Sequence, residues 1–216
     1  MRLLRQLLQL LFPEKCILCR KVLEKGQTDL CKQCRYDNPS YVNRKSSPQF
    51  LDSFTAVWYY ERHVRSSLLR YKFYGARHYA AGYGRLLAMA VREAHPEGFD
   101  LLTWIPVSRK RMLRRGYDQV QLIAAAAGRE LETAPVPLLK KIRHNPPQSG
   151  LRDAAQRRAN VLGAYRVLTP EQIAGKRILL LDDVLTTGAT ASECARVLKT
   201  AGAKEVHCAA MAAVRK

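Results

Sequence analysis

Acidic residues are scarce in this chain. Its 216 residues include 18 Asp and Glu against 37 Lys and Arg, which gives a formal net charge of +19 at pH 7. This excess favours polyanionic partners: nucleic acid, an anionic membrane or a phosphorylated substrate. Long apolar runs are also missing, and none reaches 18 residues, which excludes a transmembrane helix. The length supports one ordinary core plus a small extra module.

Several common catalytic and metal-binding signatures are absent as well. No G-x-x-x-x-G-K-[ST] loop occurs, which excludes a P-loop NTPase. The phosphatase-type D-x-D is missing because Val184 stands at its second acidic position. The five histidines are scattered, with neither H-E-x-x-H nor H-x-x-x-H. We therefore expect them on the surface or satisfied in the core.

The N-terminal residues 1–15 do not form a secretory signal. Arg5, Gln6 and Gln9 interrupt their apolar run, and no small-residue cleavage site follows before Cys16. Leucines at helical spacing predict a short amphipathic helix that packs on its own domain, with docking on a membrane or partner as the alternative. These features predict a cytoplasmic protein, or one held peripherally at the inner membrane face.

What the chain does contain is a compact cysteine module. Four of its six cysteines form two C-x-x-C pairs separated by eleven residues: Cys16, Cys19, Cys31 and Cys34. This spacing predicts a zinc ribbon in residues 1–40, in which structural Zn²⁺ supplies the folding energy, about 10–16 kcal/mol. Disulfides are the alternative, but no export signal supports an oxidising compartment.

After a polar linker over residues 39–48, strand and helix patterns alternate through residues 50–216. This alternation predicts an α/β domain with a mostly parallel sheet flanked by helices. Expected strands cover 54–60, 101–107, 138–143, 164–168, 177–182 and 205–214, and expected helices cover 63–71, 77–93, 117–131 and 190–200.

Residues 178–190, ILLLDDVLTTGAT, are the most informative segment. An apolar run with the length of a buried parallel strand ends in Asp182 and Asp183, where open α/β sheets place their ligands. A turn then opens a helix, so its free N–H groups and dipole favour a phosphate. Paired carboxylates beside this phosphate cup suit a sugar phosphate. The cup consists of Thr186, Thr187, Gly188, Ala189 and Thr190.

Basic residues gather in three places. Arg70, Lys72 and Arg77 alternate with tyrosines and Phe73, which is the pattern expected for stacking on single-stranded nucleic acid. A second cluster follows the strand that ends at Pro106 and contains Arg109, Arg114 and Arg115; its arginines suit a pyrophosphate. A third runs from Lys140 to Arg158.

The segment 178–190 resembles the phosphoribosyl-pyrophosphate (PRPP) signature of type I phosphoribosyltransferases. The resemblance implies that Asp182 and Asp183 face the ribose 2- and 3-hydroxyls and that residues 186–190 hold the 5-phosphate, with Mg²⁺ accompanying PRPP. Purine-salvage members carry an acid, their proposed base, where this chain has Thr186. This departure argues against a purine-salvage reaction.

Nearly the whole chain is similar to the competence-protein ComF family. The matching stretches are the cysteine ribbon, the PRPP signature, YKFYGARHYA (71–80), IPVSRKRMLRRGYDQVQLIA (105–124) and RHNPPQSGLRDAAQRRANVLGAYRV (143–167). The resemblance implies a type I phosphoribosyltransferase-like fold and a pyrophosphate loop that contains Ser108 and Arg109. It also implies a flexible loop over PRPP in residues 143–164, whose polar members are Gln148, Arg152, Arg157 and Asn160.

Two functions follow as hypotheses. The first is a PRPP-binding, phosphoribosyltransferase-like protein that acts in natural competence, the uptake of single-stranded DNA, and contacts that DNA through Arg70, Lys72, Arg77, Arg114 and Arg115. The second is an active phosphoribosyltransferase of nucleotide metabolism, with an unknown acceptor and no DNA role. The zinc ribbon docks either DNA or a protein, for instance a helicase of the uptake machinery.

Overall fold

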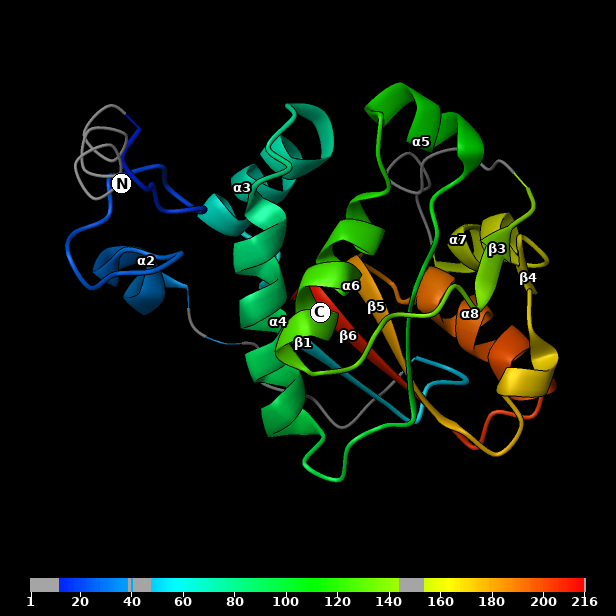
Figure 1. The fold of residues 1–216 in the computed structure, drawn as a ribbon. Helices are drawn as coiled ribbons and strands as arrows, with labels where there is room; N and C mark the ends of the chain where they lie inside the picture. Colours follow the sequence, from blue (N-terminus) through cyan, green and yellow to red (C-terminus); the bar gives the residue numbers. More distant parts are fainter. Residues whose placement is uncertain (1–11, 39, 41–47, 144–153, 216) are drawn as a thin grey trace.

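A four-stranded parallel sheet forms the centre of the molecule, in a computed structural model that describes residues 12–38, 40, 48–143 and 154–215 (Figure 1). Its strand order is β1-β6-β5-β2, with bounds β1 Ser53–Tyr59, β6 Glu205–Ala213, β5 Arg177–Leu185 and β2 Leu101–Trp104. Leu181 of β5 pairs with Trp104 on one side and Ala209 on the other. Because the strands are parallel, their carboxyl ends share one edge of the sheet.

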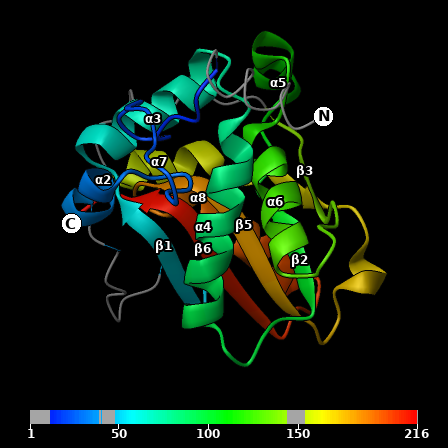
Figure 2. The same cartoon turned by 60° about the vertical axis from the view of Figure 1, so that its left-hand side comes forward.

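Helices cover both faces of this sheet. On one face lie α4 (Tyr79–Ala94) and α6 (Gln119–Glu130), and α8 (Ala189–Thr200) lies on the other, as Figures 1 and 2 show together. Side chains of β5 alternate between the two cores. Leu179 and Leu181 belong to the core under α4 and α6, while Ile178 and Leu180 belong to the core under α8. The doubly covered, apolar strand predicted from the sequence is confirmed.

Elements near the expected bounds include α3 (Arg62–Phe73) and a separate antiparallel pair, β3 (Leu139–Lys141) with β4 (Tyr165–Val167). Within residues 50–216, two α-helices were not expected: α5 (Arg109–Arg115) in the second basic cluster, and α7 (Ala154–Val161) in the predicted flexible loop. The expected end of the signature strand at Asp182 is wrong, because β5 continues to Leu185 through its pairing with β6. A short 3₁₀ helix, η2 (Pro170–Gln172), precedes β5.

The cysteine module, which includes α2 (Lys32–Asp37), packs against α3 and α4 rather than standing apart (Figure 2). The main-chain oxygen of Ile17 accepts hydrogen bonds from Ser67 and Arg70 of α3. The carboxylate of Asp29 makes a bidentate ion pair with Arg85 of α4, at 2.6 and 2.9 Å. The division into residues 1–40 and 50–216 stays a prediction.

The expected N-terminal amphipathic helix lies outside the described residues. Within those residues, no helix is both long and apolar enough to cross a membrane.

Candidate functional site

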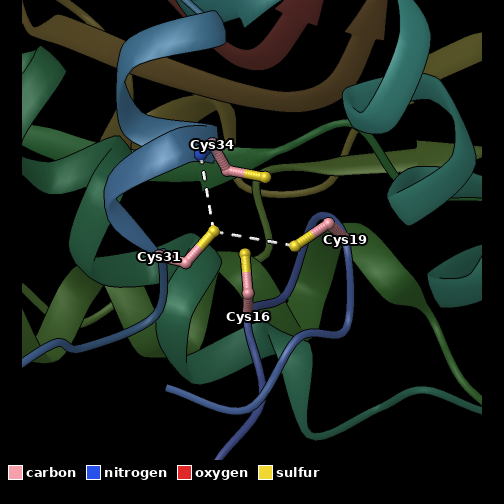
Figure 3. A group of neighbouring side chains, drawn as sticks. All are labelled: Cys16, Cys19, Cys31 and Cys34. Carbon is pink, nitrogen blue, oxygen red and sulfur yellow. Dashed lines mark hydrogen bonds between the residues drawn. The ribbon is translucent and has the colours of Figure 1, made fainter. Parts of the chain in front are cut away.

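The four cysteines of the two C-x-x-C pairs converge on one point (Figure 3). Their sulfur atoms all lie within 4.8 Å of one another, and Cys16, Cys31 and Cys34 are buried. The first pair sits in a tight knuckle, in which the N–H of Arg20 donates to the oxygen of Cys16 at 2.9 Å. In the second pair Cys31 caps α2, because its Sγ accepts from the N–H of Cys34 at 3.4 Å.

This set of donors fits a structural zinc ion. Four thiolates at one point match the tetrahedral Cys₄ sites of zinc ribbons. Burial raises the pKa of Cys19 and Cys34, whereas main-chain N–H groups at Cys19 and Cys31 outweigh burial at Cys16 and lower its pKa to about 7. The remaining two cysteines, Cys194 and Cys208, are fully buried in the core under α8, as expected for small apolar residues.

A second candidate site is a cavity of about 420 Å³ at the carboxyl edge of the sheet. Asp182 and Asp183 are its acidic lining residues, and Thr186 and Thr190 line it beyond them. Against these two acids stand six basic side chains from α3, α5, α7 and β3: Lys72, Arg111, Arg114, Arg115, Lys141 and Arg157. The cavity therefore suits a polyanion that also offers hydroxyl groups or a metal to carboxylates.

Asp183 points toward α3 and α6. It is 6% exposed, and its two carboxylate oxygens accept from Lys72 at 2.8 Å and from the amide of Gln119 at 3.0 Å. Burial alone would raise the pKa of Asp183, but the ammonium of Lys72 and the Gln119 amide outweigh it and hold the pKa below its ordinary value. Gln119 is itself fixed, since Tyr71 donates to its main-chain oxygen at 2.7 Å.

Asp182 points to the opposite face because side chains alternate along a strand. Its Oδ1 accepts from the N–H of Asp183 at 2.8 Å. Burial, reinforced by the neighbouring charge of Asp183, raises the pKa of Asp182 to about 8. On this side of the cavity Lys141 donates to the Tyr165 hydroxyl at 3.1 Å, and burial lowers the pKa of Lys141 to about 8.

The loop after β5 leads into the amino terminus of α8. Gly188 is the N-cap with φ of +76°, and the Thr187 hydroxyl accepts from the N–H of Ala189 at 3.4 Å. Pro48 packs so closely on Gly188 that a Cβ there would lie 2.4 Å from the proline ring. Ser192 of α8 donates to the main-chain oxygen of Gln49. The turn is thus held from outside by residues 48–49.

The basic cluster after β2 forms a helix rather than an open loop. Ser108 is the N-cap of α5, where its Oγ accepts from the N–H of Arg111 at 3.4 Å. Arg109 is exposed and does not line the cavity, whereas Arg111, Arg114 and Arg115 do. Asp118 connects the segment after β2 to α6, because it caps α6 and accepts from the N–H of Val107 at 3.1 Å.

The residues expected to contact nucleic acid occupy different environments. Arg70 donates to the main-chain oxygens of Ile17 and Leu18 in the cysteine module, and Lys72 pairs with Asp183. Arg77 is exposed, with its guanidinium 4.5 Å from the centre of the Tyr117 ring, and Arg114 is exposed on α5. Arg115 lies 4.9 Å from the ring centre of Phe73.

From the expected flexible loop, Arg157 and Asn160 line the cavity from α7, while Gln148 and Arg152 lie outside the described residues. Three polar residues of the cavity were not among the predicted site residues: Arg111, Gln119 and Lys141. The first and last belong to recognised basic clusters. The signal for Gln119 is a polar residue at the first helical position directly after the N-cap Asp118.

Comparison with known families agrees with this anatomy. Residues 114–216 match the phosphoribosyl transferase domain family, and residues 7–45 match the double zinc ribbon domain family. The fold and the sites thus define a type I phosphoribosyltransferase-like α/β domain joined to a zinc ribbon module.

Two relatives align with most of the length of this chain. Competence protein F of Haemophilus influenzae is 26% identical over 223 aligned positions, covering 91% of this chain and 95% of that protein. DNA utilization protein YhgH of Escherichia coli O157:H7 is 27% identical over 201 positions, covering 89% and 87%. The resemblance to the competence-protein ComF family that the sequence predicts is confirmed by these relatives over most of the chain.

Among solved structures, the glutamine PRPP amidotransferase of B. subtilis is similar with a TM-score of 0.44 and 20% identity, over 66% of this chain. This chain spans 30% of the length of that structure.

Proposed function

We propose that the protein binds PRPP with Mg²⁺ in the 420 Å³ cavity and acts in the uptake or use of single-stranded DNA. The observation that carries the proposal is the meeting of an acid pair and a helix amino terminus in a cavity lined by six basic side chains. In this proposal the loop 186–190 holds the 5-phosphate. Arg111 of α5, with Lys141 and Arg157, faces the pyrophosphate.

The two carboxylates have different parts in this proposal. Asp183 is already bonded to Lys72 and Gln119, so it orients the cavity wall and the basic side chain beside it. Asp182 has its second oxygen available to a ribose hydroxyl or to Mg²⁺, which neutralises charge on the pyrophosphate when bound. Ionising Asp182 for such a contact becomes easier as the pH approaches about 8, its raised pKa.

Calorimetry with PRPP and Mg²⁺ tests the ligand. The Asp182→Asn, Asp183→Asn double variant keeps the shape of both side chains but removes their charge, and we expect binding to weaken at least tenfold. Glu171→Gln, an exposed acid of η2, is the matched control and should bind as the wild type does. Equal affinity of the double variant and the control would contradict the proposal.

The DNA role rests on the names of the relatives and on the charge of +19. Phe73, which lines the cavity, and its neighbour Tyr74 are 54% and 79% exposed, and the guanidinium of Arg115 on α5 lies 4.9 Å from the centre of the Phe73 ring. Stacking of bases on these rings together with phosphate neutralisation is the expected mode. Arg70 and Lys72 are engaged inside the protein, so we assign the contact to Phe73, Tyr74, Arg77, Arg114 and Arg115.

Salt titration of oligonucleotide binding tests this assignment. For single strands, the slope of log affinity against log salt concentration is about −0.7 for each phosphate that is neutralised. If about five phosphates are neutralised, affinity should fall roughly a hundredfold between 50 and 200 mM salt. Arg114→Ala should make this salt dependence shallower by roughly the contribution of one phosphate. Arg129→Ala, at an exposed arginine of α6, is the control and should leave the salt dependence unchanged. Binding that ignores salt would contradict the DNA role.

An active phosphoribosyltransferase is the second candidate. The observation that favours it is the position of Arg111, Arg114 and Arg115 at one side of the acid pair, where they would stabilise charge growing on a departing pyrophosphate. Incubation with PRPP and Mg²⁺, with and without single-stranded DNA, tests it through pyrophosphate release. Pyrophosphate release that is lost in an Asp182 variant would support catalytic turnover. If no pyrophosphate is released, the protein binds PRPP without turning it over.

The zinc ribbon offers a docking surface for a protein partner, for which a helicase of the uptake machinery is our proposal. Tyr36 and Val22 on the ribbon are 85% and 56% exposed. Deleting residues 1–40 would also expose α3 and α4, so the point variant Tyr36→Ala is the sharper test. We expect it to weaken helicase pull-down while DNA binding stays unchanged.

A further inference from the structure

A second group of possible metal ligands lies at the opposite edge of the sheet from the acid pair. His207 stands near the start of β6, and His95 and Glu97 follow the end of α4. One ligand atom from each of the three lies within 4.8 Å of those of the other two. Apart from the four cysteines, this is the only such group in the described part of the chain.

The two imidazoles are buried and face each other. His95 and His207 are each 7% exposed, and their ring centres are 4.6 Å apart. The Nε2 atom of His95 has no hydrogen-bond partner, although it is buried. A buried nitrogen without a partner is destabilising, and a bound ion would give it one.

The remaining polar atoms of the group are arranged as supports. Nδ1 of His95 lies 3.4 Å from the Glu97 carboxylate. His207 contacts Ser53 at 2.9 Å through Nδ1, so its Nε2, which lies 3.1 Å from the Glu205 carboxylate, is the nitrogen that would exchange this contact for an ion. Carboxylates and hydroxyls beside imidazole rings fix the orientation of metal-binding histidines in proteins.

Charge also favours a cation here, in a chain that is strongly basic elsewhere. Glu97 and Glu205 both pair with histidine rather than with Lys or Arg. Arg177, which donates to the main-chain oxygen of Glu97 at 3.0 Å, places its guanidinium 3.6 Å from Asp100. The Glu97 side chain is 52% exposed, so it provides both an entry path and freedom to move.

We propose that His95, His207 and Glu97 form a binding site for a divalent transition-metal ion, separate from the zinc ribbon and the cavity. Two nitrogen donors and one carboxylate suit Zn²⁺, Ni²⁺ or Cu²⁺, whereas Mg²⁺ and Ca²⁺ prefer all-oxygen sites. Bonds of about 2.0–2.1 Å bring tetrahedral ligand atoms to roughly 3.4 Å from one another, so the exposed Glu97 side chain closes onto the ion.

Calorimetric titration of the untagged, zinc-loaded protein with Ni²⁺ tests the site. We expect one Ni²⁺ per chain beyond the ribbon zinc, with affinity reduced at least tenfold in His95→Gln, His207→Gln and Glu97→Gln. His63→Gln, an exposed histidine on α3, is the matched control and should bind as the wild type does. Because Glu97 is exposed, its variant keeps the test decisive even where a buried histidine variant fails to fold.

A second readout identifies the ligands. Cu²⁺ in the same position should show nitrogen hyperfine structure in its electron paramagnetic resonance spectrum, and this signal should be lost in His207→Gln. Sulfur-to-metal absorption bands would instead place the ion in the ribbon. Such bands, or equal Ni²⁺ binding by Glu97→Gln and the wild type, would overturn the proposal.

Discussion

At the scale of single residues, Asp182 and Asp183 are neighbours whose pKa values move in opposite directions. Strand alternation sends Asp183 toward Lys72 and Gln119, whereas Asp182 faces the other core without a cation in direct contact. One acid is therefore held ionised, and the other retains its proton in part near neutral pH. The sequence shows only two consecutive aspartates and does not predict that their pKa values differ.

The ion pair between Lys72 and Asp183 should contribute to stability at neutral pH. Lys72→Met leaves a buried carboxylate with only Gln119 as a partner, and we expect a loss of about 2 kcal/mol. Because the pKa of Asp183 is lowered on folding, this contribution exists above the ordinary carboxyl pKa and disappears as the pH falls through the lowered value. Urea denaturation over a pH series measures it. Lys110→Met, an exposed lysine of α5, is the control and should change little.

Asp182 should have the opposite effect on stability. Its pKa rises to about 8 on folding, so the folded chain holds the proton more tightly and loses stability as pH climbs from about 4 to 8. Asp182→Asn removes this loss, and we expect the variant to be about 1–2 kcal/mol more stable than the wild type above pH 8. Urea denaturation at several pH values measures the difference, which should vanish in acid. If the difference in unfolding free energy between the variant and the wild type does not increase with pH, the raised pKa of Asp182 would be contradicted.

At the scale of elements, the sequence is informative where apolar periodicity is strong. The strands β5 and β6 and the helices α4, α6 and α8 have apolar faces, and they lie within a few residues of the expected bounds. The helix α5 was missed because none of its residues is buried. The sequence also predicted only part of the cavity lining, because the contact between Lys72 and Asp183 joins residues 111 positions apart. Local sequence patterns can identify each of the two residues as a candidate, but they do not predict that the two residues are in contact.

The turn before α8 allows a test of how closely that element is held. Gly188 and Gly175 have nearly equal φ values, +76° and +72°, but only a Cβ on Gly188 would meet another atom, the ring of Pro48 at 2.4 Å. Gly175→Ala should cost about 1 kcal/mol for the left-handed backbone alone. Gly188→Ala should cost at least about 1 kcal/mol more through overpacking, and PRPP affinity should fall only in this variant. An equal loss of stability in the two variants would contradict this expectation and would mean that residues 48–49 move aside to make room for the added Cβ.

At the scale of the whole molecule, the zinc ribbon and the α/β domain share one core. Ile17, Leu18 and Leu30 of the ribbon belong to the same buried cluster as the tyrosines of α3 and α4. Gly82 of α4 makes this approach possible, because a Cβ there would lie 2.6 Å from the Asp29 carboxylate. Metal in the ribbon therefore stabilises the neighbouring helices as well as the ribbon itself.

Removal of zinc should loosen one side of the protein and spare the other. Without the metal, the contacts of Ile17 and Asp29 with Ser67, Arg70 and Arg85 lose their support. We expect hydrogen exchange after chelation to rise at least about tenfold in residues 12–38 and in α3 and α4, since local opening follows the contacts that are lost. The helix α8, on the far face of the sheet, is the internal control and should keep its protection. Faster exchange confined to residues 12–38 would show an independent ribbon, and a uniform rise would show that the metal supports the entire fold.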